Sequence, residues 1–269
     1  GECIQNPGWM SVNCAASCHQ CYLLDPQVRC LRANLDMVQE PAVRPGDVNR
    51  IFEGLAEQAN TCATDNAKDG DCHSPYTITV YSQDPWVVTL DDFMSEHEMD
   101  AILRLTMDQF AASAETGEID ASGVQSSTFS EHRTSESAFC NSDCHQDPAV
   151  QAVMKRISNV VNISDDNFEA MQVLRYNPGK YYRVHHDMNP ADIEIPVGPR
   201  MYTFFLYLAD VEEGGETHFP LLNISIKPKK GSALFWPNVL SDAPTSPDDR
   251  TRHESLPVGR GVKYAANTW

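Results

Sequence analysis

The sequence predicts an α+β fold in which helices flank a β-sandwich or barrel. Two observations support this fold class: helical patterns occur mainly before Phe168, and short strand patterns separated by glycine and proline turns follow it. The chain has 269 residues, of which 41% are apolar and 22% are charged, so its composition is that of a folded protein rather than a disordered one.

The chain divides into three parts by composition. Residues 1–21 form a small cysteine-rich module, residues 22–75 are polar and contain proline, and a larger domain extends over 76–269. The middle part has the character of a linker, with one helix predicted around 48–59.

Two strands and a helix open the larger domain. β-branched and aromatic residues predict strands at 77–81 and 86–90. Ser95 and Glu98 then have the spacing of a capping box, and apolar residues continue at helical intervals as far as Phe110. We therefore expect a helix that begins just after Ser95.

A second helix follows a polar segment. Asp147 is a suitable N-cap and Pro148 a suitable first residue, and apolar residues recur at helical spacing up to Val161. The polar stretch 114–132 before this helix, and a second one at 238–252, are predicted to be loops that act as lids. Ordinary surface loops are the alternative for both stretches.

Strands dominate the remainder of the domain. Asn-Pro-Gly, Glu-Gly-Gly and Lys-Gly sequences supply turns between them. The clearest strands are predicted at residues 171–176, 201–208, 224–227, 232–236 and 262–268.

Charge and hydropathy exclude several kinds of partner. Lysine and arginine total 20 against 38 aspartate and glutamate residues, which gives a net charge of −18. Such a surface repels phosphate backbones, so we expect no nucleic-acid partner. No apolar run approaches the length of about 20 residues that spans a bilayer, so we expect no membrane span in this chain. No signal peptide is present at Gly1, and an upstream signal or anchor would lie outside this sequence.

Cysteine usage indicates an oxidising compartment. The pairs Cys62/Cys72 and Cys140/Cys144 are close in sequence and lie in polar segments, where a disulfide can stabilise a chain that lacks a core. The odd number of cysteines leaves one free or paired outside this chain. The nine are Cys3, Cys14, Cys18, Cys21, Cys30, Cys62, Cys72, Cys140 and Cys144.

A zinc site is the alternative for part of this set. Cys18-His-Gln-Cys21 has the spacing of zinc ligands, but no second pair of the zinc-ribbon type follows it. Two Asn-x-Ser sequons, at Asn162 and Asn223, predict N-glycosylation. Because glycosylation and disulfides belong to the same compartment, the sequons favour disulfides over zinc.

A metal-binding pattern lies in the strand-rich half. His185 and Asp187 are two residues apart, so in a strand both side chains lie on one face. One further histidine, with His218 and His253 as the candidates, would complete a two-histidine, one-carboxylate triad. Such a triad binds Fe(II) and leaves coordination positions open. On its own, the His-x-Asp pattern is a weak signal that favours an ordinary surface strand.

A lysine near the C-terminus has an unusual setting. Lys263 belongs to the last predicted strand, where its neighbours are apolar or small. A buried lysine requires an anionic partner, and the distal carboxylate of 2-oxoglutarate is such a partner. An edge-strand lysine exposed to water is the alternative.

Several motifs, taken in order, resemble one family over residues 76–269. The resemblance is to the catalytic domain of prolyl 4-hydroxylases of the plant and algal type, which are Fe(II)/2-oxoglutarate dioxygenases on a double-stranded β-helix, or jelly roll. The matching stretches are Arg133-Thr-Ser135, Glu169-Ala-Met-Gln-Val-Leu-Arg-Tyr176, Tyr182-Arg-Val-His185-His-Asp187, Arg200-Met-Tyr-Thr203, the 207–217 segment, Lys227-Pro-Lys-Lys-Gly231 and the His253 to Lys263 spacing.

The resemblance implies a role for each matching position. His185, Asp187 and His253 would hold the iron, and these three with Lys263 would form the catalytic set. Lys263 would bind the distal carboxylate of 2-oxoglutarate, assisted by Tyr176 and Thr217. The positions implied to line the peptide channel are Arg133, Ser135, Glu169, Tyr182, Arg200 and Trp269. A plain surface ion pair is the alternative for Glu169 and Arg200.

The implied reaction is the hydroxylation of peptidyl proline to 4-hydroxyproline in a Pro-rich secreted or cell-surface protein. It would release succinate and CO₂ and use Fe(II), O₂ and ascorbate, with 2-oxoglutarate as cosubstrate. The implied location is the endoplasmic reticulum or Golgi lumen, with secretion or anchoring through an upstream segment as further options. Two alternatives stay open: the same chemistry on lysine or a small molecule, and a non-catalytic extracellular binding or structural protein.

The cysteine-rich module carries a second resemblance. Residues 3–21 look like the latter part of a ShK-toxin-like (ShKT) domain, which normally has six cysteines in three disulfides. The resemblance would pair Cys3 with Cys18 and place the partners of Cys14 and Cys21 upstream of Gly1. It implies an accessory module that binds a docking partner rather than a catalytic one.

Overall fold

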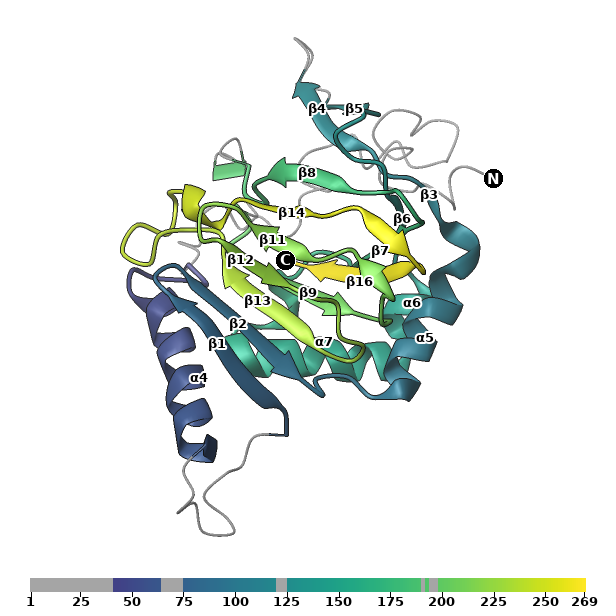
Figure 1. Cartoon of the computed structure of the whole chain (residues 1–269). Coiled ribbons are helices and arrows are strands. Elements are labelled where there is room, and N and C mark those ends of the chain that lie inside the picture. The colour runs from purple at the N-terminus through teal and green to yellow at the C-terminus, as the bar shows by residue number, and fades with distance from the viewer. Residues whose placement is uncertain (1–40, 64–74, 120–124, 190–191, 194–197) are drawn as a thin grey trace, which may run out of the picture. The chain divides into compact units, whose positions relative to one another are not determined.

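The structure is a computed structural model of the chain (Figure 1). Its described residues are 41–63, 75–119, 125–189, 192–193 and 198–269. The chain forms two compact units, Gly1–Pro41 and Ala42–Trp269, and every element below belongs to the second unit. The predicted module over 1–21, its resemblance to the ShKT domain and the Cys3–Cys18 pairing lie outside the described residues.

The second unit combines four helices with many short strands in its described residues. The helices are α4 (Asp47–Ala63), α5 (Glu96–Thr106), α6 (Asp143–Gln146) and α7 (Pro148–Val161), with 3₁₀ turns at η2 (Met107–Gln109), η3 (Asp165–Asn167) and η5 (Asp249–Thr251). The strands are β1 (Thr77–Gln83), β2 (Trp86–Asp91), β3 (Ala111–Ala112), β4 (Glu115–Ile119), β5 (Gln125–Thr128), β6 (Glu136–Phe139), β7 (Gln172–Tyr176), β8 (Tyr182–His185), β9 (Tyr202–Tyr207), β10 (Glu213–Gly214), β11 (Thr217–Phe219), β12 (Ile224–Ile226), β13 (Ala233–Pro237), β14 (His253–Ser255), β15 (Val258–Arg260) and β16 (Lys263–Thr268). None of these helices has both the length and the apolar character that crossing a bilayer requires.

The strands form a large and a small antiparallel sheet. The large sheet has eight strands in the order β1-β2-β13-β9-β16-β7-β6-β3, and the small sheet has four in the order β12-β11-β14-β8. Two further pairs, β10–β15 and β4–β5, stand apart from these sheets. In Figure 1, α7 lies behind the large sheet, and β8, β14 and β11 lie in front of it. The fold is therefore a mixed one of helices and antiparallel sheets, as predicted.

Strand β9 shows how the sequence builds these layers. Side chains alternate between the two faces of a strand, and β9 is apolar or buried at every position. Tyr202, Phe204 and Leu206 pack into a core with the helices, whereas Phe205 and Tyr207 pack into a second core on the other face. The centre of the large sheet is therefore buried on both sides.

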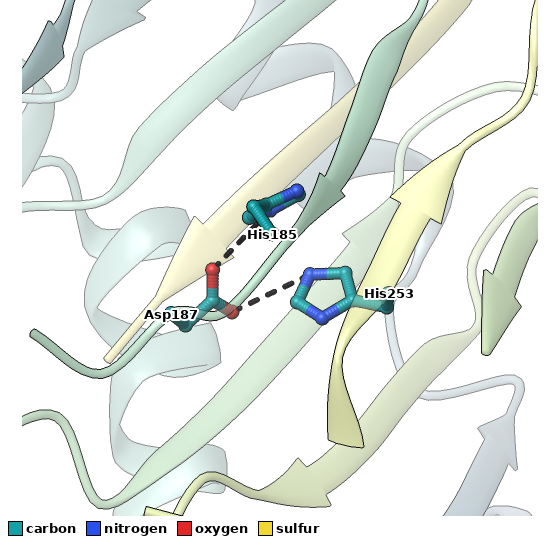
Figure 2. A group of neighbouring side chains, drawn as sticks. All are labelled: His185, Asp187 and His253. Atoms are coloured by element: carbon teal, nitrogen blue, oxygen red, sulfur yellow. Dashed lines mark ion pairs between the residues drawn. The ribbon is translucent and has the colours of Figure 1, made fainter. Parts of the chain in front are cut away.

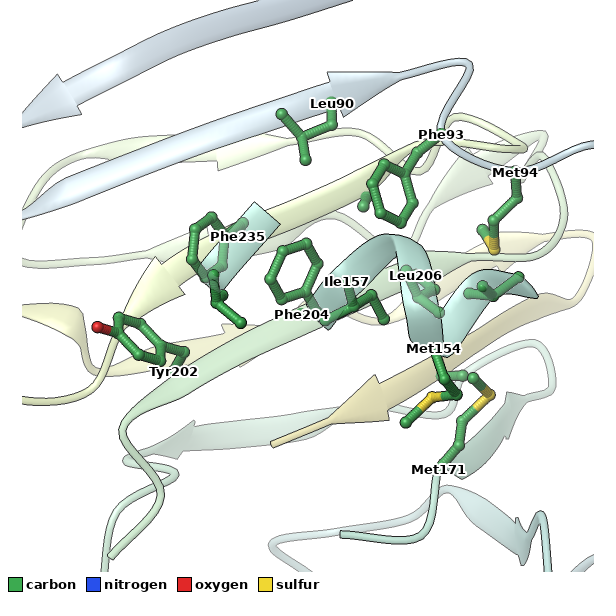
Figure 3. Packing of buried hydrophobic residues seen from close by; sticks show 14 of the residues in the cluster. Leu90, Phe93, Met94, Met154, Ile157, Met171, Tyr202, Phe204, Leu206 and Phe235 are labelled. Atoms are coloured by element: carbon green, nitrogen blue, oxygen red, sulfur yellow. The ribbon is translucent and has the colours of Figure 1, made fainter. Parts of the chain in front are cut away.

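The first core lies between the large sheet and the helices. Figure 3 shows Met154 and Ile157 of α7 beside Phe204 and Leu206 of β9. Phe204 also stacks on Phe235 of β13, with ring centroids 4.1 Å apart. Because such cores are close-packed, they hold the large sheet in a fixed shape.

The second core lies between the two sheets. Trp236 of β13 meets Phe219 of β11 edge to face, with ring centroids 5.3 Å apart. Leu174 of β7 and Val258 of β15 belong to the same cluster. Polar side chains that project between the sheets are therefore shielded from water, and this is where the candidate site lies.

Both predicted helices of the larger domain are confirmed, together with their N-caps. Ser95 and Glu98 form the capping box of α5, in which the Ser95 backbone nitrogen donates to Glu98 Oε2 at 2.8 Å. At the start of α7, Asp147 Oδ1 accepts from the Ala149 backbone nitrogen at 2.9 Å. The predicted strands of the C-terminal region appear as β7, β9, β12, β13 and β16.

The predicted loop at 114–132 is wrong in part. Strands β4 and β5 lie inside it and pair as an antiparallel hairpin. Their residues are mostly small and polar, so the alternation of apolar and polar residues that predicts a strand is absent. The second predicted loop, 238–252, contains η5, and its residues Val239, Asp248 and Thr251 are buried.

The helix predicted near 48–59 is confirmed as α4 and is longer than expected. Its Phe52 stacks between Phe235, with ring centroids 4.3 Å apart, and Trp86, with centroids 5.7 Å apart. The compact unit accordingly begins at Ala42. The amphipathic helix buries its apolar face on the sheet, so this part of the predicted linker 22–75 packs with the domain.

Candidate metal centre

Strand pairing brings two histidines together. His253 of β14 pairs with His185 of β8 in the antiparallel register, and their ring centroids are 4.3 Å apart. The Asp187 carboxylate lies between them, with Oδ1 3.5 Å from His185 Nε2 and Oδ2 3.7 Å from His253 Nε2 (Figure 2). One potential ligand atom from each of the three lies within 4.8 Å of the others.

The backbone around Asp187 differs from the one predicted. The sequence placed His185 and Asp187 on one face of a single strand, but β8 ends at His185 and Asp187 lies in the bend that follows. The alternation of a strand therefore does not orient the carboxylate. Its support comes from Thr203 of β9, whose Oγ1 donates to Asp187 Oδ2 at 2.7 Å.

Backbone carbonyls fix the tautomer of both imidazoles. His185 Nδ1 lies 2.8 Å from the carbonyl oxygen of Arg183, and His253 Nδ1 lies 3.1 Å from that of Thr251. A carbonyl only accepts, so each Nδ1 carries a proton and, in a neutral ring, each Nε2 presents a lone pair. Both lone pairs face Asp187. This is the orientation that metal-bound histidines use.

The protonation states match the same interpretation. Burial lowers the pKa of His253 to about 3, so its ring is neutral at neutral pH. Burial would raise the pKa of Asp187, but the two neighbouring imidazoles and the Thr203 hydroxyl hold that pKa well below its ordinary value. The ionised Asp187 carboxylate, the neutral His253 ring and Nε2 of His185 together offer three ligand atoms. Such a donor set fits a divalent metal ion.

The other histidines of this region lie elsewhere. His186 turns away from the group, and its Nε2 lies 3.1 Å from the carbonyl oxygen of Asp248. His218, the second candidate for the triad, is on β11 with Nδ1 2.9 Å from Glu254 Oε1. Neither belongs to the metal-ligand group of the described residues.

Lys263 is buried in the middle of the large sheet. Its strand, β16, lies between β9 and β7, so the alternative of an exposed edge-strand lysine is excluded. The residue is 0% exposed, and its Nζ donates to Ser255 Oγ at 2.8 Å. Within the part of the chain that the structure describes, no ion pair includes Lys263.

Aromatic rings and burial shape the electrostatics of this lysine. Lys263 Nζ lies 5.0 Å from the ring centroid of Phe205 and 5.2 Å from that of Tyr176. Burial lowers the pKa of Lys263 to about 7, although the charge of Glu216 acts in the opposite direction. A buried ammonium here has no anionic partner among the described residues. It can therefore form an ion pair with the carboxylate of a ligand.

Tyr176 and Thr217 both lie beside Lys263. Tyr176 of β7 is paired with Lys263 in the sheet register, and Lys263 Nζ lies 5.2 Å from the centroid of its ring. Thr217 of β11 is paired with Ser255, the residue that receives the Lys263 hydrogen bond. The three residues predicted to bind 2-oxoglutarate are thus brought to one place.

Three of the predicted channel residues form a group next to the histidines. Tyr182 stacks on His185 with ring centroids 3.6 Å apart. Arg133 also lies over the Tyr182 ring, with its guanidinium carbon 4.9 Å from the ring centroid. Arg133 Nε also donates to Ser135 Oγ at 3.3 Å.

The other three channel residues form a second group at the end of β16. Arg200 donates to both carboxylate oxygens of Glu169, at 2.6 and 2.8 Å. The Arg200 guanidinium also lies 3.5 Å from the centroid of the Trp269 ring. The ion pair that was the alternative for these two residues is therefore present, and its arginine also stacks on an aromatic ring.

Four polar residues of the site were not predicted: Thr203, Tyr207, Asn238 and Ser255. Ser255 is two residues after His253, so the alternation of a strand could have identified it. Thr203 lies in the Arg200-Met-Tyr-Thr203 stretch that resembles the family. Asn238, which donates to Thr203 Oγ1 at 3.0 Å, carries no sequence signal.

The predicted modification sites have mixed settings. Asn162 and Asn223 are exposed, as attachment of a glycan requires. The Cys140–Cys144 disulfide is present, with Cα atoms 5.0 Å apart. Cys62 is disulfide-bonded, and its predicted partner lies outside the described residues, as do Cys3, Cys14, Cys18, Cys21, Cys30 and Cys72.

Comparisons with known proteins agree with this chemistry. Residues 171–269 match the model of the 2OG-Fe(II) oxygenase superfamily. The chain is 33% identical over 205 residues to prolyl 4-hydroxylase 1 of Arabidopsis thaliana, which covers 71% of this chain and 70% of that protein. It is 35% identical over 188 residues to prolyl 4-hydroxylase subunit alpha-2 of Gallus gallus, of which it spans 34%.

A solved structure extends the comparison to three dimensions. The viral collagen prolyl hydroxylase of Paramecium Bursaria Chlorella virus-1, solved as a 2OG complex, superposes with a TM-score of 0.53 at 30% sequence identity. The match covers 68% of this chain and 94% of the viral one.

Proposed function

The chain belongs to the prolyl 4-hydroxylase family of 2OG-Fe(II) oxygenases, and on this premise we propose that it hydroxylates peptidyl proline to 4-hydroxyproline. The second core and its two facing sheets would form the jelly roll of such an enzyme. The reaction joins proline, 2-oxoglutarate and O₂ to give hydroxyproline, succinate and CO₂.

One observation carries the proposal. One ligand atom from each of His185, Asp187 and His253 lies within 4.8 Å of the others. The Lys263 ammonium is buried beside rings of the second core, without a carboxylate partner among the described residues. A metal ion satisfies the first group, and a dicarboxylate that also binds the metal satisfies the second. Fe(II) with 2-oxoglutarate is the pair that meets both requirements.

Each residue has a distinct task in this account. His185, Asp187 and His253 would hold the ion through three ligand atoms. Bound Fe(II) would activate O₂, which oxidises 2-oxoglutarate and the C–H bond of proline. Lys263, with Tyr176 and Thr217, binds the distal carboxylate and orients the cosubstrate. The apolar rings around Lys263 exclude water, which strengthens that ion pair.

A Pro-rich peptide would lie across the two groups of channel residues. Tyr182 beside His185, and Trp269 under Arg200, offer aromatic faces of the kind that bind polyproline II segments. Such segments are preformed, so binding them costs little conformational entropy. Arg133 and Ser135 next to Tyr182, and Glu169 next to Arg200, would hydrogen-bond the peptide backbone.

The enzyme would act in the secretory pathway, in the endoplasmic reticulum or Golgi lumen, on a secreted or cell-surface protein. The Cys140–Cys144 disulfide and the exposed sequons at Asn162 and Asn223 support an oxidising, glycosylating compartment. Ascorbate would keep the iron ferrous. The ShKT-like module over 1–21 would bind a docking partner.

A peptide panel tests the proposal. Purified protein is incubated with Fe(II), ascorbate and 2-oxoglutarate, and with a poly-proline peptide, a proline-free peptide or a lysine-rich peptide. We expect equal amounts of hydroxyproline and succinate with the first peptide only. His253→Ala should be inactive, whereas His218→Ala, a histidine outside the group, should retain activity. Hydroxylation of lysine, or no product with any peptide, would contradict the proposal.

A further inference from the structure

Two buried side chains form a hydrogen-bonded chain that ends on the Asp187 carboxylate. Thr203 Oγ1 donates to Asp187 Oδ2 at 2.7 Å, and Asn238 Nδ2 donates to Thr203 Oγ1 at 3.0 Å. Thr203 and Asn238 are both 0% exposed. Among the described residues, Asn238 Oδ1 has no hydrogen-bond partner.

The carboxylate sets the direction of each bond in this chain. Ionised Asp187 only accepts, so the Thr203 hydroxyl points its single proton at it. Thr203 Oγ1 can then only accept from its other neighbour, and Asn238 must present its amide nitrogen rather than its oxygen. The unpartnered Asn238 Oδ1 is the consequence.

The backbone holds both side chains in place. Thr203 is paired with Trp236 in the β9–β13 register, and Asn238 follows β13 directly. The Asn238 backbone nitrogen donates to the Met201 carbonyl at 2.8 Å, and the Asn238 carbonyl accepts from the Asp248 nitrogen at 3.0 Å. The backbone positions of Thr203 and Asn238 are therefore fixed by hydrogen bonds.

Asp187 needs such a support because its own element does not orient it. It lies in the bend beyond the end of β8, whereas His253 lies on a strand and His185 on the last residue of one. The Thr203 hydroxyl occupies one side of Oδ2 and leaves the other lone pairs of the carboxylate available to an ion.

We propose that Thr203 and Asn238 are positioning residues that hold Asp187 in the orientation required for metal binding, an inference that rests on the proposed function. Groups that hydrogen-bond a metal ligand in this way typically contribute about 10- to 100-fold to metal affinity. Their contribution should therefore appear in the dissociation constant of the metal rather than in that of 2-oxoglutarate.

Calorimetric titration of Mn(II) into the metal-free protein tests this inference without turnover. Thr203→Val keeps the shape of the side chain and removes the hydroxyl, so the Kd for Mn(II) should rise by about 10- to 100-fold. Thr203→Ser keeps the hydroxyl and should restore most of the affinity. Asn238→Ala removes the donor to Thr203 and should weaken Mn(II) binding by a smaller factor. The 2-oxoglutarate KM at saturating metal should not change.

Thr268→Val is the matched control. Thr268 is 2% exposed in the large sheet, and its Oγ1 has no partner among the described residues, so this variant should bind Mn(II) as the wild type does. Equal Mn(II) affinity for wild type and Thr203→Val would refute the positioning role. A wild type that binds no Mn(II) would instead refute the proposed function. Thermal unfolding shows whether Thr203→Val is folded. If it is not, the Mn(II) affinities of the single variants Thr203→Ser and Asn238→Ala decide the test.

Discussion

Replacement of Lys263 by methionine isolates the buried ammonium. Methionine is unbranched and of similar length, so it can fill the space that the lysine chain occupies among Phe205, Tyr176 and Tyr207. The substitution removes the charge and leaves the surrounding packing in place. We expect opposite effects on cosubstrate binding and on the stability of the free protein.

The magnitude follows from burial. A lysine pKa lowered from 10.5 to about 7 corresponds to a penalty of about 5 kcal/mol on the charged form. A bound carboxylate offsets this penalty, and removal of one partner from a buried ion pair costs about 3–5 kcal/mol. The KM for 2-oxoglutarate should therefore rise by roughly 10²- to 10⁴-fold.

The assay is succinate release as a function of 2-oxoglutarate concentration at saturating metal and peptide. Lys229→Met is the matched control, because the Lys229 side chain is 55% exposed and pairs with Asp91 on the surface. It should leave the KM unchanged. An unchanged KM in Lys263→Met would refute the assignment of this lysine to the distal carboxylate.

The free protein should respond to the same substitution in a pH-dependent way. Because the folded lysine has the lower pKa, the unfolded chain binds more protons between about pH 7 and 10.5, and wild-type stability rises with pH in that window. Lys263→Met should therefore raise the free energy of unfolding by about 1–4 kcal/mol at pH 7 or below, and the gain should shrink toward pH 10.5. Urea unfolding of both proteins at pH 7 and at pH 10.5 measures this difference in stability. A variant less stable than wild type at pH 7 would contradict the burial of an unpaired ammonium.

Asp187→Ala should abolish metal binding and leave the fold intact, because both cores are built from other residues; metal analysis with circular dichroism checks this, and unchanged metal content would exclude Asp187 as a ligand. Arg200→Gln should raise the peptide KM without changing the 2-oxoglutarate KM, because its guanidinium lies against Trp269 in the proposed channel; no change in the peptide KM would remove Arg200 from that channel. Phe52→Ala should lower the free energy of unfolding by about 3–5 kcal/mol, because the ring is fully buried between Trp86 and Phe235; a loss within about 0.5 kcal/mol in urea would mean that α4 does not pack as described.

Local signals in the sequence predicted much of the fold. The Ser95/Glu98 capping box and the Asp147-Pro148 start are short-range features, and both helices begin where these signals place them. The hairpin of β4 and β5 was missed because its polar residues lack the periodicity of a half-buried strand. Sheet order could not be predicted, because pairing between distant strands depends on tertiary packing.

The residues of the candidate site also differ in whether local sequence signals could predict them. His185, Asp187 and Lys263 could be proposed from spacing and from the residues that flank them. The choice of His253 over His218 came from a family resemblance, since both histidines follow at plausible distances. Asn238 could not be found from sequence, because its contact with Thr203 exists only once β13 and β9 are side by side.

The source of the oxygen atom in the product is the decisive measurement for the proposed oxygenase chemistry. The protein is incubated with Fe(II), ascorbate, 2-oxoglutarate and a Pro-rich peptide under ¹⁸O₂, and the products are measured by mass spectrometry. The account predicts one ¹⁸O atom in each new 4-hydroxyproline and one in each succinate. Two results would contradict the proposed reaction: hydroxyproline that carries oxygen from water, or labelled succinate without any ¹⁸O in the peptide.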